Sequence, residues 1–465
     1  MRAPHHAGRS GRASSPPDDA SRADDASRAA GTTGSLPRLD ALPLPAADGG
    51  AHVLAPRSAL RRYGLISFLT WFPPGLMMAS MILLMTSRGL DLAQVGMVIS
   101  VQAIVVVALE LPTGGLADVL GRRVLLAVSA LFSVAGLALL AVATSVWLFM
   151  VASVLKGVAR ALSSGPAQAW YVDMLHAARG AEADLKPGLA RGEAMGSLSL
   201  CLATLTGGFM PLVLPGGLVT PMIAAAVAAA VLFVVVLVAM PEPPYPRPTI
   251  GSVMRDVPVT IGAGLRLGLR DRALSRLLLV SFAIGAGLYS IEVLTPGRLA
   301  SLTGGAESAS SVYALVASAG FAASGFGSWS APWVARLLKG SVPAAVAGTG
   351  VGAAALGTLA ATTVLTGVWG VAAAGASYVV MFAAMGVAGL LRVEMMHRRV
   401  GSSQRATLMS VDSLQLQFGG VVFSLGLGLL ASRAGTAAAW WSAAAVVLVS
   451  ALLYLRLPAA GTPPE

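Results

Sequence analysis

Cysteine and lysine are nearly absent from this chain of 465 residues, which has one cysteine and only three lysines among its 32 basic residues. A single cysteine excludes an intramolecular disulfide and any metal site built from cysteine ligands. The five histidines are scattered, and no two of them have the spacing that places two metal ligands on one helix face. The sequence therefore predicts no metal site and no cofactor.

Charged residues are also scarce, at 11% of the chain against about 25% in soluble domains. Hydrophobic residues make up 56%, and the mean hydropathy is +0.76. Most side chains must therefore face something other than water, and a lipid bilayer is the predicted surrounding. The net charge of +11 does not indicate a nucleic-acid partner, because a basic stripe interleaved with exposed aromatics is missing.

The first part of the chain, residues 1–58, lacks long apolar runs. It has no apolar core of about 7–15 residues followed by a small-residue cleavage site, so it does not resemble a signal peptide. Its composition, rich in Ala, Ser, Asp, Arg, Pro and Gly, predicts a disordered cytoplasmic tail. A misplaced start codon is the alternative explanation for this segment.

Long apolar stretches dominate the chain from Tyr63 onward. A membrane-spanning helix needs about 20 mostly apolar residues, and twelve segments qualify. They are residues 64–86, 93–116, 124–143, 147–171, 193–213, 219–240, 276–296, 309–331, 342–365, 368–391, 406–431 and 436–456. The predicted fold is an all-α membrane protein of twelve transmembrane helices in two six-helix bundles, residues 59–240 and 276–457, with a C-terminal tail at 458–465.

A polar linker, residues 241–275, separates the two predicted bundles. Four prolines at its start stop the sixth helix. Apolar residues then recur at helical spacing beside several arginines, which predicts an amphipathic helix on the membrane surface. The linker either couples the movements of the two halves or merely tethers them.

The distribution of Arg and Lys predicts the orientation in the membrane. The loops and flanks on the N-terminal side hold 21 of these residues, and the opposite side holds only Arg88, Arg298 and Arg433. Both termini are therefore expected in the cytoplasm, with the chain in the inner (plasma) membrane. The outer loops are short, the longest predicted at 297–308, and leave no room for a catalytic domain. The chain is not expected to be an enzyme.

The loop between the second and third spans carries glycines, an aspartate and arginines at distinctive spacing. Its sequence is Gly114-Gly-Leu-Ala-Asp118-Val-Leu-Gly121-Arg122-Arg123. It resembles the signature loop of the major facilitator superfamily, although Val119 stands where Arg or Lys is frequent. The segments 157–173 and 405–417 resemble bacterial drug-efflux-like members of that superfamily. The second-half counterpart of the loop has Pro332 where its aspartate would align, which weakens the drug-antiport resemblance.

The signature loop also has a physical interpretation. Gly114 allows two membrane helices to approach closely, and Gly121 permits a tight reversal. The resemblance implies that the cluster holds the cytoplasmic side together in the outward-open state, so that Asp118, Arg122 and Arg123 are gating residues. A static staple is the alternative, because ion pairs also serve fixed packing.

Charged residues inside the predicted spans are functional candidates, since a charge at the bilayer centre costs about 2.5–3.5 kcal/mol. The candidates are Glu110, Lys156, Arg160, Glu292 and Asp412. Lys156 and Arg160 share one helix face and need anionic partners, for which Glu110 and Asp173 are the expected carboxylates, or an anionic cargo. Arg160 serves either in proton coupling or substrate contact, or in a structural ion pair.

Two carboxyl groups receive different interpretations. Glu292, deep in the seventh span beside Tyr289, is the preferred protonatable group. Asp412 is expected to reach cytoplasmic water, since charges near helix ends can snorkel. Pro73 and Pro74 are expected to interrupt the first span, and Pro296 to close the seventh; such breaks point toward a binding cavity in inverted-repeat transporters. The expected cavity lining is Trp71, Tyr171, Tyr289, Tyr378 and Gln415, unless these residues serve only in helix packing.

The resulting hypothesis is a monomeric secondary transporter that moves a small organic solute by alternating access, with protons as the coupling ion. Export is the expected direction, and uptake of a metabolite is the alternative. A non-transporting scaffold or sensor is a further alternative. A membrane enzyme acting on lipid-linked substrates is disfavoured, because the sequence places no cluster of acidic or nucleophilic residues at a membrane face. An ATP-driven pump is disfavoured because the sequence lacks a nucleotide-phosphate loop.

Overall fold

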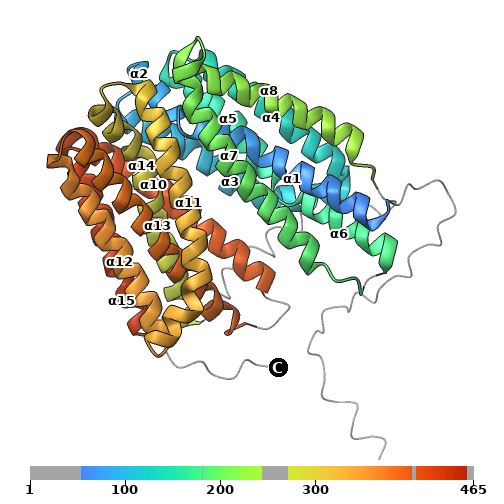
Figure 1. Ribbon diagram of the computed structural model, residues 1–465. Coiled ribbons are helices and arrows are strands. Elements are labelled where there is room, and N and C mark those ends of the chain that lie inside the picture. Colours follow the sequence, from blue (N-terminus) through green and yellow to red (C-terminus); the bar gives the residue numbers. More distant parts are fainter. Residues whose placement is uncertain (1–53, 181, 243–270, 401–404, 458–465) are drawn as a thin grey trace, which may run out of the picture. The chain divides into compact units, whose positions relative to one another are not determined.

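The computed structural model describes residues 54–180, 182–242, 271–400 and 405–457. Within these ranges the chain is helical and has no β-strand (Figure 1). Twelve of its helical segments are long and apolar enough to cross a membrane, which confirms the predicted number. The tails, 1–53 and 458–465, and most of the linker, 243–270, lie outside the described residues, as does the predicted amphipathic helix.

The helices divide into two sets of six spans, each set formed by one half of the chain. The first half contains α1 (Pro56–Met78), α2 (Met81–Ser87), α3 (Leu92–Leu120), α4 (Arg122–Val142), α5 (Val146–Ser163), α6 (Pro166–Arg179), α7 (Lys186–Val213) and α8 (Thr220–Ala239). The second half contains α10 (Arg272–Thr303), α11 (Ala306–Leu337), α12 (Ser341–Ala361), α13 (Gly367–His397), α14 (Arg405–Ala434) and α15 (Thr436–Leu455).

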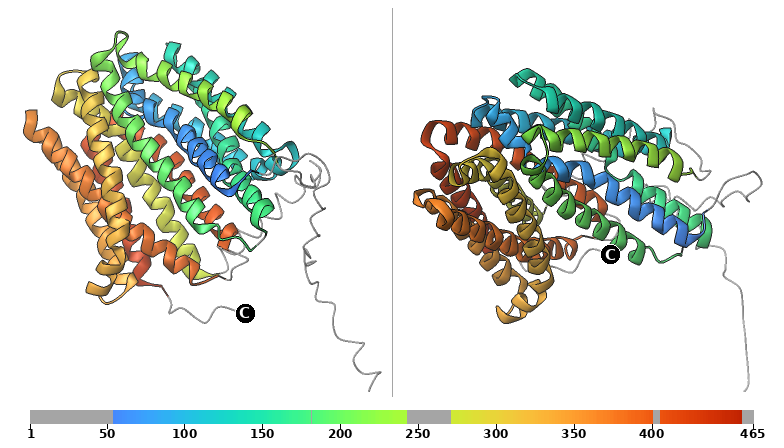
Figure 2. Two further views of the ribbon diagram at one scale, coloured as in Figure 1. Left: turned by 45° about the vertical axis from the view of Figure 1, so that its right-hand side comes forward. Right: turned by 45° about the horizontal axis from the view of Figure 1, so that its top comes forward.

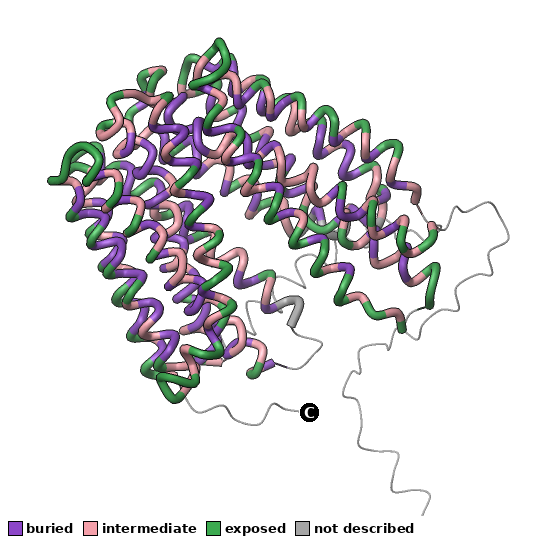
Figure 3. Tube along the Cα trace, in the orientation of Figure 1, coloured by how far each residue is buried: buried purple, intermediate pink, exposed green. Residues whose placement is uncertain are grey.

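Each half forms its own bundle, coloured blue to green and yellow to red in Figures 1 and 2. In the first bundle α1 packs on α7 and α8, and α4 packs on α5 and α8. In the second, α10 packs on α14 and α15, and α12 packs on α13 and α15. Purple buried positions alternate with green exposed ones along these helices (Figure 3), as expected where one stripe of each helix meets its neighbours. The two predicted six-helix bundles are therefore confirmed.

Small residues join the two bundles, mainly where α3 crosses α14 and α7 crosses α11. The Ser80 and Ser310 hydroxyl oxygens lie 2.7 Å apart, and the Ser100 hydroxyl bonds that of Ser424. A Cβ at Gly208 would overlap the side chain of Ala314, so glycine is needed for this approach. These contacts lie toward the membrane face that holds the α2–α3 loop, which we call the far face. The face that holds the turn at Gly121 we call the loop face.

Proline did not break the helices where the sequence predicted. α1 continues through Pro73 and Pro74, and the break before α2 comes at Ala79 and Ser80. α10 likewise continues through Pro296, so that only Gly304 and Gly305 separate it from α11. The predicted long loop at 297–308 is therefore wrong. Proline removes one hydrogen bond from a helix, and packed membrane helices tolerate that loss.

The fourth span, predicted as one helix, is two. α5 ends at Ser163 and α6 begins at Pro166, with Gly165 between them at a φ of 93°. Glycine adopts this left-handed region without a steric penalty. The break redirects the chain just beyond Arg160, and it places Asp173 on a separate helix from Lys156 and Arg160.

Two arginines at the far face cap equivalent helices in the two bundles. The Arg88 guanidinium donates to the carbonyl oxygens of Ala141, at 2.6 Å, and Ala143, at the end of α4. Arg298 donates to the carbonyls of Thr362 and Leu365, both at 2.6 Å, just past the end of α12. The last carbonyls of a helix have no partner within it and carry partial negative charge. This capping role explains why two of the three predicted far-face basic residues stand where they do.

Replacing Arg88 or Arg298 with alanine is expected to lower the free energy of unfolding by about 1–3 kcal/mol, since each removes hydrogen bonds from a charged donor. Thermal unfolding of the purified protein measures this. Arg433, exposed in the last turn of α14 at the same face, is the matched control, and its alanine variant should leave the unfolding midpoint within a degree or two of wild type. Equal effects at all three positions would contradict the capping role.

Candidate transport cavity

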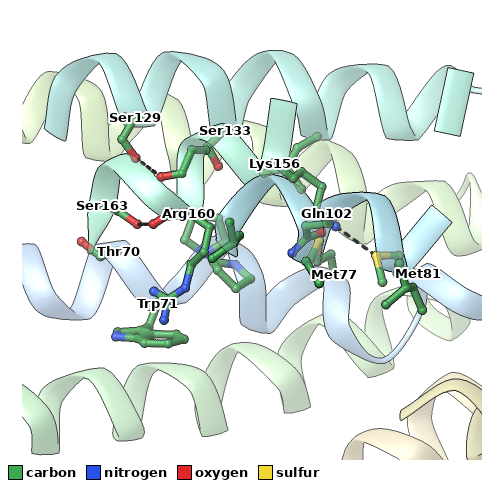
Figure 4. Close-up of a pocket in the computed structure, with 18 of the residues that line it drawn as sticks. Thr70, Trp71, Met77, Met81, Gln102, Ser129, Ser133, Lys156, Arg160 and Ser163 are labelled. Carbon is green, nitrogen blue, oxygen red and sulfur yellow. Dashed lines mark hydrogen bonds between the residues drawn. The ribbon is translucent and has the colours of Figure 1, made fainter. Parts of the chain in front are cut away.

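A cavity of about 290 Å³ lies inside the first bundle, beside its contact with the second (Figure 4). Helices α1, α3, α4 and α5 supply most of its wall, α2 and α8 add one residue each, and α10 and α14 contribute from the second bundle. Its polar and aromatic lining residues are Thr70, Trp71, Gln102, Ser129, Ser133, Lys156, Arg160, Ser163, Tyr289, Glu292 and Gln417. Residues from both halves therefore meet around one space within the membrane-spanning part of the chain.

Lys156 is the most deeply buried charge in this cavity, with 7% of its surface exposed. Its Nζ lies 3.1 Å from the thioether sulfur of Met81 (Figure 4). No carboxylate of the described residues lies within ion-pair distance of it. The carboxylate that interacts with it electrostatically is Glu292, on α10 of the other bundle. The expected partners of Lys156, Glu110 and Asp173, are therefore not the ones that face it.

Arg160 lies one helical turn further along α5, on the same side. Its guanidinium carbon lies 4.4 Å from the centroid of the Trp71 ring (Figure 4), a cation–π contact. Glu110 interacts with Arg160 electrostatically, as expected. The Glu110 carboxylate also accepts a 2.8 Å hydrogen bond from the Gln417 side-chain amide on α14, so that Glu110 links the two bundles.

Glu292 lines the cavity from α10, one helical turn from Tyr289. Besides Lys156, the ionisable groups that interact with it are the phenols of Tyr289, Tyr313 and Tyr378. Neutral phenols do not balance a negative charge, so Lys156 is the cation that faces this carboxylate.

The expected aromatic lining is only partly at the cavity. Trp71 and Tyr289 line it, whereas Tyr171, Tyr378 and Gln415 do not. Tyr171 stacks on Tyr63, with ring centroids 4.7 Å apart, and Tyr378 stacks on Phe382 at 4.8 Å. Gln417, two residues further along α14 than Gln415, supplies the amide. A period of 3.6 residues separates those two positions by about 200° around the helix.

The signature loop lies at the loop face. Gly114 and Asp118 belong to the last turns of α3, and Gly121 makes the turn into α4 with a φ of 99°. The Arg122 guanidinium pairs with the Asp173 carboxylate on α6, and the Arg123 backbone N–H donates to the Glu242 carboxylate at 3.0 Å. The sequence predicted that Asp173 would pair with Lys156 or Arg160. In the structure it pairs with Arg122 instead. These contacts connect helices within the first bundle.

A second buried charge cluster lies in the second bundle, and the sequence did not reveal it. Asp412, on α14, is 6% exposed and forms a bidentate ion pair with Arg392 of α13. In this pair Arg392 Nη2 lies 3.0 Å from Asp412 Oδ2. Ser281 of α10 bonds both. The expectation that Asp412 reaches water is wrong. The predicted tenth span, 368–391, ends just before Arg392 and so predicts a cytoplasmic loop position for it, whereas α13 continues to His397.

The sequence of the chain matches the model of one known protein family. The model of the Major Facilitator Superfamily matches residues 63–398. The chain belongs to this superfamily. No curated protein matches. The resemblance inferred from the signature loop is confirmed.

Several solved structures of transporters share the fold at low sequence identity. The nucleoside transporter NupG is 14% identical, with a TM-score of 0.70 over 86% of this chain and 98% of that one. A D-xylose–proton symporter is 12% identical, with a TM-score of 0.65 over 87% and 99%. A peptide transporter POT in complex with sulfate is 15% identical, with a TM-score of 0.65 over 85% and 93%. At such identities the likeness establishes the fold and not the solute.

Proposed function

We propose that this facilitator is a proton-coupled secondary transporter, which moves a small organic solute through the cavity by alternating access. It acts as a monomer in the cytoplasmic membrane, with both termini in the cytoplasm. The observation that carries the proposal is that Lys156 and Glu292, from opposite bundles, face each other in the cavity. A cation and a carboxylate inside the membrane are costly unless each is paired with an opposite charge or with a bound ligand.

The pair suits coupling because its two members belong to the two bodies that move. When the bundles rock, the distance between α5 and α10 changes, and so does the attraction between the charges. A proton on Glu292 removes that attraction and leaves Lys156 uncompensated. The protonation state of Glu292 and the arrangement of the bundles therefore bias each other, which is the linkage a coupled carrier requires.

The sign of the solute's charge decides the direction. A cationic solute competes with the proton for Glu292, which gives exchange and, with an inward proton gradient, export. An anionic solute is favoured by the proton, which gives joint movement and uptake. Export is the direction favoured by the resemblance to drug-efflux-like members. Uptake is the second candidate, and it is favoured by the Arg160 guanidinium at the cavity, whose N–H groups have no hydrogen-bond acceptor among the described residues.

The signature loop is proposed to act as a gate at the loop face. Arg122 and Asp173, with Arg123 and Glu242, brace α4 against α6 and the end of α8. A braced first bundle moves as a rigid unit, and the proposed gate consists of the signature-loop residues Gly114, Asp118, Gly121, Arg122 and Arg123 at its edge. In the proposed gating role, this loop-face end of the first bundle closes against the second bundle when the two bundles rock.

Flux into liposomes tests the function. The purified full-length protein is reconstituted, and the movement of radiolabelled anionic, cationic and neutral aromatic solutes is followed with and without an imposed pH gradient. A solute that accumulates only with the gradient, and not in protein-free liposomes, supports the proposal. Flux equal to that of protein-free liposomes across the panel would favour a scaffold or sensor. The direction of the gradient that drives accumulation separates export from uptake.

A further inference from the structure

The two cationic side chains of the cavity, the buried Lys156 and the cavity-exposed Arg160, lack an oxygen partner for their hydrogen-bond donors. Among the described residues, no oxygen accepts a hydrogen bond from the side chain of Lys156 or of Arg160. Lys156 is more than nine-tenths buried, and its one polar contact is a thioether, which is only a weak acceptor. A buried ammonium with such a partner is costly unless a ligand supplies the missing acceptor.

Three neutral polar groups of the wall are also without a partner. Within the described part of the chain, the side-chain amide of Gln102, the hydroxyl of Ser133 and the phenol of Tyr289 form no hydrogen bond, and all three groups line the same space. Glu292 is the one carboxylate among the described lining residues. Lys156 and Arg160 have donors and no acceptor, so a ligand with acceptor oxygens suits this wall, and a negative charge on those oxygens strengthens the bonds.

The geometry at Arg160 adds a second requirement. The guanidinium lies over the Trp71 ring, which orients it while its N–H groups remain without an acceptor among the described residues. A planar fork of donors matches the paired oxygens of a carboxylate, sulfonate or phosphate group. The Trp71 ring beside it, together with Met77 and Val106 in the wall, offers apolar surface to the rest of the ligand.

The size of the space limits that ligand. A cavity of about 290 Å³ lies at the lower end of the roughly 300–1,000 Å³ that ligand pockets occupy. It accommodates one ring with an acidic group, and not an oligopeptide or a dinucleotide.

We infer that the transported solute is a small organic anion, with an oxyanion group held by Arg160 and Lys156 and a flat apolar body held beside Trp71. This inference rests on the proposed transport function, because it names the solute of the same cavity. It favours uptake over export, since an anion and a proton on Glu292 assist each other in binding.

Four probe compounds of fixed charge test separately whether the ligand needs a negative charge and whether it needs an aromatic ring. They are benzenesulfonate, which has both the ring and the anion; methanesulfonate, which lacks the ring; benzyl alcohol, which lacks the charge; and benzyltrimethylammonium, which reverses it. The thermal unfolding midpoint of the purified full-length protein is measured against the concentration of each, because a ligand of the folded state raises it by mass action. We expect a saturable rise with benzenesulfonate, a weaker one with methanesulfonate, and none with the other two.

Variants assign the effect to the site. Arg160→Gln should weaken the apparent Kd for benzenesulfonate by about tenfold or more, as expected for the loss of charge-assisted hydrogen bonds. Arg160→Lys, which keeps the charge and loses the fork, should fall between Arg160→Gln and wild type. Arg336, on α11 outside the cavity lining, is the control, and Arg336→Gln should bind as wild type does.

Stabilisation by benzyltrimethylammonium in place of benzenesulfonate would overturn the inference, as would no stabilisation by any probe or an unchanged affinity in Arg160→Gln. These results leave the transport proposal standing if another solute shows proton-driven flux. Conversely, benzenesulfonate binding that depends on Arg160, without any flux in liposomes, supports the anion site and contradicts the transport function.

Discussion

Replacing Glu292 with glutamine is expected to abolish the accumulation of solute against its gradient while leaving exchange of solute for solute in place. Glutamine has nearly the same shape as the protonated carboxyl but cannot gain or lose a proton. The altered cavity still binds and reorients, because Lys156, Arg160 and Trp71 remain. What is lost is the link between the proton gradient and the movement of the bundles.

The size of the effect follows from the gradient. One pH unit is worth about 1.4 kcal/mol per proton, so a carrier that couples one proton accumulates its solute by about tenfold, and the variant should reach no accumulation at all. Radiolabelled solute in proteoliposomes measures both modes. The control is Glu307→Gln, since Glu307 is an exposed carboxylate in the first turn of α11 at the far face. Accumulation that persists in Glu292→Gln would move the coupling role to another residue.

Removing Arg392 is expected to destabilise the protein by about 3–5 kcal/mol, the cost of leaving one member of a buried ion pair without its partner. In Arg392→Ala the Asp412 carboxylate keeps only the Ser281 hydroxyl, in a site where both charged side chains are 9% exposed. The variant should show a lower unfolding midpoint and a lower yield in the membrane. The double variant Arg392→Met with Asp412→Leu should recover most of the loss, because it removes both charges together.

The matched control lies on the same helix. Arg398 pairs with Glu394 four residues earlier, and the two side chains are 70% and 36% exposed. Exposed pairs at this spacing contribute about 0.3–0.5 kcal/mol, so Arg398→Ala should leave the midpoint almost unchanged. If the double variant is as unstable as Arg392→Ala, the polar cluster itself, and not the unpaired charge, is what the second bundle requires.

At three sites the structure differs from what the sequence predicts. Proline predicted breaks at Pro73, Pro74 and Pro296, but the helices continue, because neighbouring helices hold a chain that has lost one hydrogen bond. The sequence predicts a loop position for Arg392, because a charge normally marks the end of an apolar run. Its pairing with Asp412 lets α13 carry it inside the bundle.

The number and type of the elements were available from the sequence for a simple reason. Backbone in lipid must satisfy its own hydrogen bonds, so an apolar run of about twenty residues has one solution, the helix. The signature loop likewise carried its family in consecutive residues, from Gly114 to Arg123. The sequence also predicts a tight reversal at Gly121, and the positive φ found there is one that glycine adopts without a steric penalty.

The sequence by itself determined the twelve helices, the two bundles, the family and the short set of charges from which a site had to be built. Only the tertiary structure decided the partners of most of these charges: Lys156 faces Glu292, Arg160 lies over Trp71, Arg122 pairs with Asp173, and Arg392 pairs with Asp412. The physical reason is that helix formation depends on neighbours along the chain, whereas pairing inside the membrane depends on how whole helices pack. That packing is set by small residues such as Gly208 and Ser424, spread over both halves of the chain.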